Sequence, residues 1–274
     1  MKTVHQIGLR ANQAQRKQLE FLGVSVPPGV LLPGAKCPLV TFIVAEDHPN
    51  WPLLRELFVR WDVYDQPGTV FSEEDFQAAC WLELRPGWLN GYPQPDDGHF
   101  GYLEATYDLS NSCGTCGVGR VQKAPFQIKH EPRWGRRGMF QLNWVFDEHF
   151  VTPGVWNRVF QPHGIDCRPV INLAGAELQT VVQLVVREEV DVHTDGLAHE
   201  RCAECGWIKC HPVVLGPSPA PIAEPTGHMA KTRQYFGSGG GAHKTIVVSK
   251  KLVNALKSEG VRGAMLRPIS APVP

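Results

Sequence analysis

The sequence predicts an α+β protein whose β-rich central region is tied together by four cysteines. Apolar residues recur at helical spacing near the start and near the end of the chain. Between about 102 and 192, segments rich in Val, Ile, Phe and Thr indicate strands. Two copies of the pattern CxxCG lie in and after this strand-rich part. The expected domains are an N-terminal α/β region (1–100), a double-CxxCG zinc region with a β-rich insert (101–215), and a Pro/Gly-rich linker with a C-terminal strand–helix–strand unit (216–274).

The N-terminal region shows three helix-start signals. Asn12 begins a helix that Gly23 should end. Pro52 suits the first turn of a second helix, "WPLLRELFVRW", whose apolar residues have helical spacing. Ser72 is an N-cap, with Asp75 three residues later in a variant of the capping box. The apolar run "PLVTFIVAE" suits a buried strand.

The central and C-terminal parts are organised around strands. Four segments indicate strands: "PFQIKHE", "GMFQLNWVF", "CRPVINLA" and "LQTVVQLVVREEVDV". The loop "GWLNGYPQPDDGHFG" is the best boundary between the first two regions. At the end, "KTIVV" and "VRGAMLRPI" predict strands around a helix, which Ser249 should cap and Gly260 should end.

Composition restricts the classes of function. The 274 residues are 43% hydrophobic, which is enough for a folded core. Lys plus Arg equals Asp plus Glu at 27 each, so nothing general attracts nucleic acid. No apolar run approaches the length of a membrane span, and no signal peptide follows Lys2. We therefore expect a soluble, cytoplasmic protein with reduced thiols.

The CxxCG pattern is the most specific feature of the sequence. Cys113 and Cys116 are separated by two residues and followed by Gly, as are Cys202 and Cys205. A tetrahedral Zn²⁺ takes four ligands, and one tight turn with two residues between its cysteines presents two thiolates to the ion. Backbone N–H groups of the turn can point at the sulfurs, and a following Gly permits positive φ. We therefore predict that Cys113, Cys116, Cys202 and Cys205 hold one structural Zn²⁺, and that the segment 117–201 folds back to its start.

Two other interpretations of these cysteines stay open. A single CxxC is often a redox or disulfide pair, although "CGTCGVGRVQ" lacks the helix that follows a thioredoxin-like motif. Alternatively, Cys202 and Cys205 form a site with Cys210 and a fourth ligand, for which His211 is in reach. Four thiolates leave no position for water, so the favoured site supports structure rather than chemistry.

No catalytic motif is complete. "GSGGGAHKT" departs from the phosphate-loop pattern at Ser238 and His243, so a flexible glycine loop before a strand is expected. The chain has no G-x-S-x-G, no H-E-x-x-H and no zinc-deaminase pattern. We predict no catalytic residues.

These residues resemble the double-CXXCG motif family, which is known chiefly from paralogous sets in myxobacteria. The resemblance covers roughly 102–270 and depends on "SCGTCGVGRVQKAPFQI", "FQLNWVFDEHF", "RCAECG" and "VVSKKLVNALKSEGVRGAMLRPI". Some members of that family are described as immunity proteins, which bind and neutralise a cognate toxin. The resemblance therefore implies a bacterial, non-enzymatic binding protein with a protein toxin as its partner.

Interface residues of such a protein are not encoded in a motif. Exposed aromatic and arginine side chains are the usual anchors of interfaces, which makes Trp134, Arg136 and Arg137 candidates for partner contact. The alternatives are a hydrolase with a pocket between the N-terminal and central regions, and a zinc-ribbon nucleic-acid binder. A cluster of perturbed ionisable residues would favour the first, and a basic face around the zinc the second.

Overall fold

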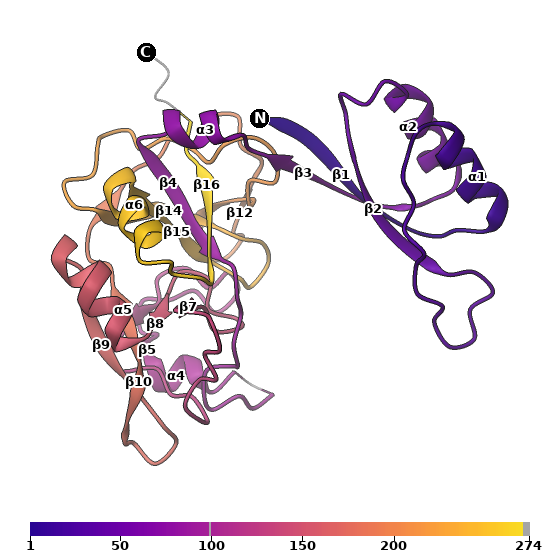
Figure 1. Cartoon of the computed structure of the whole chain (residues 1–274). Helices are drawn as coiled ribbons and strands as arrows, with labels where there is room; N and C mark the ends of the chain where they lie inside the picture. Colours follow the sequence, from indigo (N-terminus) through magenta and orange to yellow (C-terminus); the bar gives the residue numbers. More distant parts are fainter. Residues whose placement is uncertain (99, 271–274) are drawn as a thin grey trace. The chain divides into compact units, whose positions relative to one another are not determined.

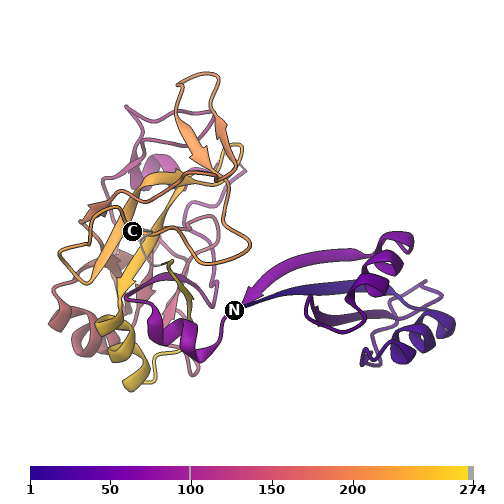
Figure 2. The same ribbon diagram turned by 90° about the horizontal axis from the view of Figure 1, so that it is seen from above.

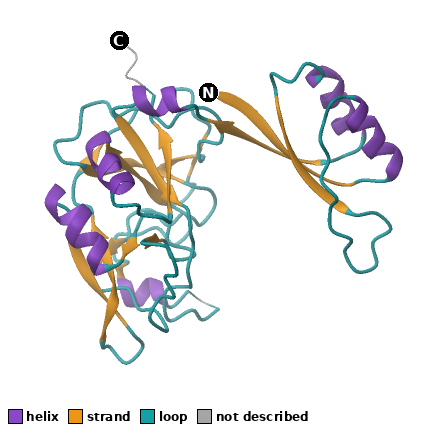
Figure 3. Cartoon of the chain, viewed as in Figure 1, coloured by secondary structure: helices purple, strands orange, loops and turns teal. Residues whose placement is uncertain are grey.

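The chain divides into two compact units. The computed structural model describes residues 1–98 and 100–270 (Figure 1). Unit 1 contains Met1–Phe76 and Val213–Gly216, and unit 2 contains Gln77–Pro212 and continues from Pro217. Helices and strands are mixed throughout, with more strand than helix (Figure 3), which confirms the predicted α+β class. Within the described residues, no helix has both the length and the hydropathy to cross a membrane.

Unit 1 is a three-stranded antiparallel sheet in the order β2-β1-β3. Two helices cover one face, and their side chains Leu19, Leu54 and Phe58 join Ile7 and Phe42 of the sheet in one apolar core. The other face of the sheet carries exposed residues of β2, so this strand is buried on one face only and not on both. The elements are β1 (Lys2–Arg10), α1 (Gln13–Phe21), β2 (Leu39–Ala45), α2 (Trp51–Arg60), β3 (Tyr64–Val70) and α3 (Glu73–Ala78), within which the boundary to unit 2 falls.

The predicted helix caps of unit 1 are confirmed. The Asn12 side chain accepts from the Gln15 amide at 2.9 Å, and the Gln15 side chain accepts from the Asn12 amide at 3.0 Å. Ser72 and Asp75 make the same reciprocal pair at the start of α3, at 2.7 and 3.3 Å. These bonds satisfy amides that a first helical turn leaves without partners.

The largest sheet of unit 2 brings together distant parts of the chain. In the described residues its order is β12-β13-β14-β15-β4-β16, with β11 beside β14. β4, which comes first in this unit, lies between β15 and β16 from the other end of the chain (Figure 1). Residues just after 76 therefore belong to unit 2, although the domain boundary predicted from the sequence lies near residue 100. The strands are β4 (Trp81–Pro86), β11 (Glu189–Val190), β12 (His199–Arg201), β13 (Ile208–Cys210), β14 (Met229–Phe236), β15 (His243–Ser249) and β16 (Ala264–Pro268).

The C-terminal strand–helix–strand unit forms as the sequence predicts. α6 (Lys250–Ser258) begins where the Ser249 hydroxyl accepts from the Leu252 amide at 3.3 Å. It ends before Gly260, whose φ is +61°. Both β15 and β16 are antiparallel to β4, so they run parallel to each other with β4 between them.

A second sheet of unit 2 has the order β7-β8-β10-β9, and its side chains contribute to an aromatic core. Phe126, Phe140 and Phe150 are fully buried, and neighbouring ring centroids lie 5.4 and 5.3 Å apart. Figure 2 shows this part of the unit from a second direction. The remaining elements are α4 (Tyr102–Thr106), β5 (Tyr107–Asp108), β6 (Val121–Gln122), β7 (Met139–Phe140), β8 (Phe150–Val151), α5 (Pro153–Val155), the π-helical turn η1 (Trp156–Phe160), the 3-10 turn η2 (Gln161–His163), β9 (Asp166–Ile171) and β10 (Glu177–Val185).

The strand predictions for the central region are correct in part. The last two predicted segments form β9 and β10. "PFQIKHE" contributes an isolated bridge between Gln127 and Ile171, and "GMFQLNWVF" contributes the two residues of β7. Their apolar residues fill the aromatic core without extended pairing, so burial rather than strand formation explains their composition.

Candidate metal centre

The first CxxCG lies in the loop between two paired strands. β5 and β6 are antiparallel and flank the segment that carries Cys113 and Cys116. The Cys113 amide donates to the Val118 carbonyl at 2.9 Å, and the Gly117 amide donates to the Cys113 carbonyl at 2.8 Å. Gly117 has φ of +76°, a conformation that favours glycine. The turn therefore has the form that the sequence pattern predicts.

The second CxxCG repeats this turn on another hairpin. β12 and β13 are antiparallel and flank Cys202 and Cys205. The Cys202 amide donates to the Trp207 carbonyl at 2.8 Å, and the Gly206 amide donates to the Cys202 carbonyl at 3.0 Å. Gly206 has φ of +74°. Two hairpin tips far apart in the sequence thus share one local geometry.

The two turns bring four thiols together. The sulfur atoms of Cys113 and Cys202 are 3.8 Å apart, and those of Cys116 and Cys205 are 3.5 Å apart. All four sulfurs lie within 4.8 Å of one another. Four bonds of about 2.3 Å in a tetrahedron separate sulfurs by about 3.8 Å, whereas a disulfide requires about 2.05 Å. The spacing fits four ligands of one metal ion and excludes disulfides among these cysteines.

Backbone amides act on the thiols of the cluster. Amides of Cys205 and Glu204 donate to the Cys202 sulfur, and these bonds lower its pKa to about 7. Burial raises the pKa of Cys116 to about 12, and the Val118 amide opposes this. Because metals bind the thiolate, these amides favour the form that a metal ion would need, and deprotonation of the buried Cys116 would require the positive charge of such an ion.

A carboxylate joins the two turns on their outer side. Glu204, from the second turn, accepts from the Thr115 hydroxyl of the first turn and lies 3.6 Å from the Cys113 sulfur. This carboxylate therefore connects the two CxxCG turns directly.

A buried lysine supports the cluster from the inner side. The Lys209 side chain of β13 is fully buried, and its ammonium donates to the Cys116 carbonyl at 3.3 Å and to the Gly241 carbonyl at 3.1 Å. It also donates to the Gly239 carbonyl and pairs with Glu200 at 3.0 Å. The glycine loop before β15 is therefore held by this lysine, as a structural support rather than a phosphate site.

The alternative ligands do not join the cluster. Cys210 is buried on β13 against Val192 and Phe236, and burial raises its pKa. His211 is exposed, and its amide donates to the Ala198 carbonyl. In the described part of the chain, the four predicted cysteines are the one group of three or more His, Cys, Asp or Glu side chains with ligand atoms this close.

The residues predicted for partner contact lie on a separate turn. The Trp134 indole is half-buried, donates to the Thr180 carbonyl at 3.0 Å and packs against Trp88 and Phe140. Arg136 is exposed. Arg137 is exposed as well, and its guanidinium lies 4.7 Å from the Trp88 ring centroid. Trp134 therefore anchors the turn that presents the two arginines.

Lys209 is a residue of this centre that sequence reasoning missed. In "WIKC" the lysine stands between Ile208, which is exposed, and Cys210, which is buried. Hydropathy alone predicts a buried isoleucine and an exposed lysine. Lys209 can be buried because carbonyl groups of the glycine loop accept hydrogen bonds from its ammonium group. The residues around Lys209 in the sequence give no sign of these distant acceptors.

Comparisons with known proteins add no family to this description. A scan against protein-family models gives no match, and a search of curated proteins gives none either. The resemblance to the double-CXXCG family therefore stays a prediction from the residues.

Proposed function

We propose that Cys113, Cys116, Cys202 and Cys205 bind one structural Zn²⁺ and that the chain is a non-enzymatic binding protein. The observation that carries this proposal is the meeting of two turns of the same hydrogen-bond pattern, whose sulfurs have tetrahedral spacing. Thiolate sets of this kind suit Zn²⁺, whose four positions they fill. With no position left for water, the ion stabilises unit 2 and performs no chemistry.

The zinc is tested by its stoichiometry and by pairs of substitutions. Purified protein should contain about one Zn²⁺ per chain. Cys116→Ser and Cys205→Ser should each lower the free energy of unfolding, and the double variant should lose little more because both ligands serve one ion. Cys80→Ser is the matched control, since Cys80 is exposed and outside the cluster. Additive losses, or zinc absent from the purified protein, would contradict the site.

The binding role is an immunity function, in which this chain covers and neutralises a protein toxin. Its support is the resemblance of the CxxCG segments to the double-CXXCG family and the absence of any complete catalytic motif in the sequence. Arg136 and Arg137 are the proposed contact residues, since Trp134 holds their turn while both guanidinium groups stay exposed.

Protection of cells tests the immunity role. Expression of this chain should rescue bacteria from a toxic protein encoded beside its gene, and the two purified proteins should form a complex. The double variant Arg136→Glu/Arg137→Glu should lose binding, whereas Arg187→Glu, which changes an exposed arginine elsewhere, should retain it. Lack of protection by a folded, zinc-loaded protein against every toxic neighbour would refute this role.

A further inference from the structure

A cavity inside unit 2 lies beside the first CxxCG turn. Its volume is about 320 Å³, which is at the small end of the range for ligand pockets. Gly117 and Gly119 of the turn form part of its wall, and Tyr102, Tyr107 and Trp144 contribute aromatic surface. The cavity is distinct from the metal cluster and from the turn that carries Arg136 and Arg137.

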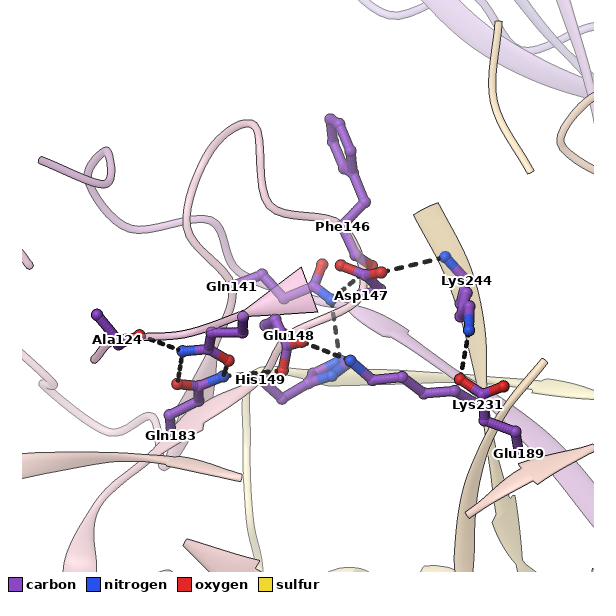
Figure 4. A network of polar contacts seen from close by, with 11 residues as sticks. Ala124, Gln141, Phe146, Asp147, Glu148, His149, Gln183, Glu189, Lys231 and Lys244 are labelled. Carbon is purple, nitrogen blue, oxygen red and sulfur yellow. Dashed lines mark hydrogen bonds and ion pairs between the residues drawn. The ribbon is translucent and has the colours of Figure 1, made fainter. Parts of the chain in front are cut away.

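The floor of the cavity is a buried ion pair whose hydrogen bonds are satisfied. Glu148 pairs with Lys231 through one carboxylate oxygen and accepts from the Gln183 amide at 2.9 Å through the other (Figure 4). Gln183 and Gln122 exchange two further bonds at 2.7 and 2.9 Å. Because each charge of the pair has its partner, this floor is rigid and close to neutral.

A second pair lies at the side of the cavity. Lys244 pairs with Glu189, and its ammonium lies 5.2 Å from the centroid of the Tyr235 ring. Asp147 accepts from the Lys244 backbone amide at 3.2 Å and has no ion-pair partner among the described residues (Figure 4). Of the three carboxylates in the lining, Glu148 and Glu189 are in ion pairs and Asp147 is not.

Two arginines in the same wall have no partner of their own. Arg120 and Arg168 are half-buried, and neither guanidinium group makes a hydrogen bond or an ion pair with any residue that the structure describes. Several more exposed arginines of unit 2 have a carboxylate partner, for example Arg158 with Glu259 and Arg187 with Asp166. A half-buried guanidinium loses part of its hydration, and here no protein hydrogen bond replaces it. An anion bound in the cavity would therefore stabilise both guanidinium groups.

The first CxxCG turn makes room for one of these guanidinium groups. A Cβ atom at Gly117 would lie 2.8 Å from the Arg120 Nη2 atom, so glycine at this position lets the side chain pack against the turn. Arg120 thereby lies against the first CxxCG turn as well as in the cavity wall. Arg168 lies on β9, outside the turn. A substitution of Arg168 therefore tests the cavity without changing a residue that packs against the CxxCG turn.

We propose that this cavity binds a small organic anion through a phosphate or carboxylate group held by Arg120 and Arg168. Leaving the two ion pairs aside, the lining carries two positive charges from these arginines and one negative charge from Asp147, which favours an anion. A guanidinium presents two parallel N–H donors that match the oxygens of either group. The aromatic side chains suit a planar or apolar body attached to that group.

Calorimetric titration of the zinc-loaded protein with three probes tests the proposal. Phenyl phosphate and benzoate carry the two candidate groups on one small ring, and benzyl alcohol is the neutral control. At least one anion should bind while benzyl alcohol does not, and the anion that binds more tightly identifies the group. Arg168→Gln should weaken binding about tenfold or more, from the loss of a charged hydrogen bond.

The matched control is Arg133→Gln, because Arg133 is an exposed arginine outside the cavity. It should leave anion binding unchanged. Arg120→Gln should weaken binding while the zinc content stays near one per chain. The proposal is overturned if neither anion binds the folded protein, or if binding is unaffected by Arg168→Gln. Loss of zinc in Arg120→Gln with binding intact in Arg168→Gln would assign Arg120 to the metal site alone.

Discussion

At the scale of single residues, the two glycines that follow the CxxC pairs differ in their surroundings. Both have positive φ, which an alanine adopts only at a cost of about 1 kcal/mol or more. A Cβ at Gly117 would also lie 2.6 Å from the Gly240 carbonyl oxygen, whereas a Cβ at Gly206 would meet no atom within 4 Å. Glycine is therefore required at position 206 by backbone conformation alone, and at position 117 by both conformation and close packing.

Alanine substitutions should reveal this difference. Gly206→Ala should lower the free energy of unfolding of the metal-loaded protein by about 1 to 2 kcal/mol. Gly117→Ala should cost more, since the glycine loop and Arg120 must also shift. Urea unfolding of both variants measures the comparison, and equal losses would contradict it.

The residues of the centre show which kinds of residue a sequence can identify. The four cysteines and both glycines were predictable, because metal ligation and positive φ each demand a particular residue type at a fixed spacing. Lys209 and the arginines of the cavity were not, because their roles depend on carbonyls and open space contributed by distant segments.

At the scale of elements, local signals at helix ends correspond closely to the structure. Asn12, Ser72 and Ser249 all cap helices where the sequence places them. The Ser249 hydroxyl has a second contact, with the His228 Nδ1 atom at 2.9 Å. The start of α6 is thus joined to the segment before β14 as well as capped.

Ser249→Ala should remove both contacts. We expect a loss of about 1 to 2 kcal/mol in the free energy of unfolding, near the upper end of measured cap losses. Ser258→Ala is the control, because Ser258 is exposed in the last turn of the same helix. Its effect should stay within about 0.5 kcal/mol. Thermal or urea unfolding compares them, and similar effects at the two serines would refute the capping role.

Strands were less predictable than helices. A strand needs a partner that lies elsewhere in the sequence, whereas a helix satisfies its own amides. "PFQIKHE" has the composition of a strand but contributes its Phe126 ring to a core and only one bridge to a neighbour. The pairing of β4 with β15 and β16 likewise cannot be predicted from the residues of β4 itself.

At the scale of the whole molecule, unit 2 contains a histidine that cannot take up a proton easily. The pKa of His149 is lowered to about 3, mainly by burial and in smaller part by the charge of Lys231, while Asp147 opposes the shift. Its Nε2 atom lies 3.2 Å from the Gln141 amide nitrogen, and its Nδ1 atom has no hydrogen-bond partner among the described residues. The folded protein therefore contains this ring in its neutral form.

The stability of the protein should fall in acid for this reason. An unfolded chain protonates the ring below about pH 6.5, while the folded chain does so only near pH 3. Stability from this group is thus complete above about pH 6.5 and decreases by about 1.4 kcal/mol per pH unit below it, down to about pH 3. Urea unfolding between pH 7 and pH 4 measures the slope.

Two variants isolate the contribution of this histidine. His149→Gln should flatten the slope relative to the native chain, whatever its effect on stability at pH 7. His193→Gln should leave the slope as it is, because His193 is exposed. An unchanged slope in His149→Gln would show that other groups cause the acid sensitivity.

The distance in sequence between the two CxxCG turns has a consequence during synthesis of the protein. Between Cys116 and Cys202 lie 85 residues, so Cys113 and Cys116 leave the ribosome well before the second pair. At about 5 to 20 residues per second, the first pair of thiols waits roughly 4 to 17 seconds for the second. During that interval it is a two-thiol ligand exposed to oxidants and to competing metals. For the proposed metal site, assembly in the cell should therefore be favoured by a reducing environment and should depend on which ions reach the growing chain first.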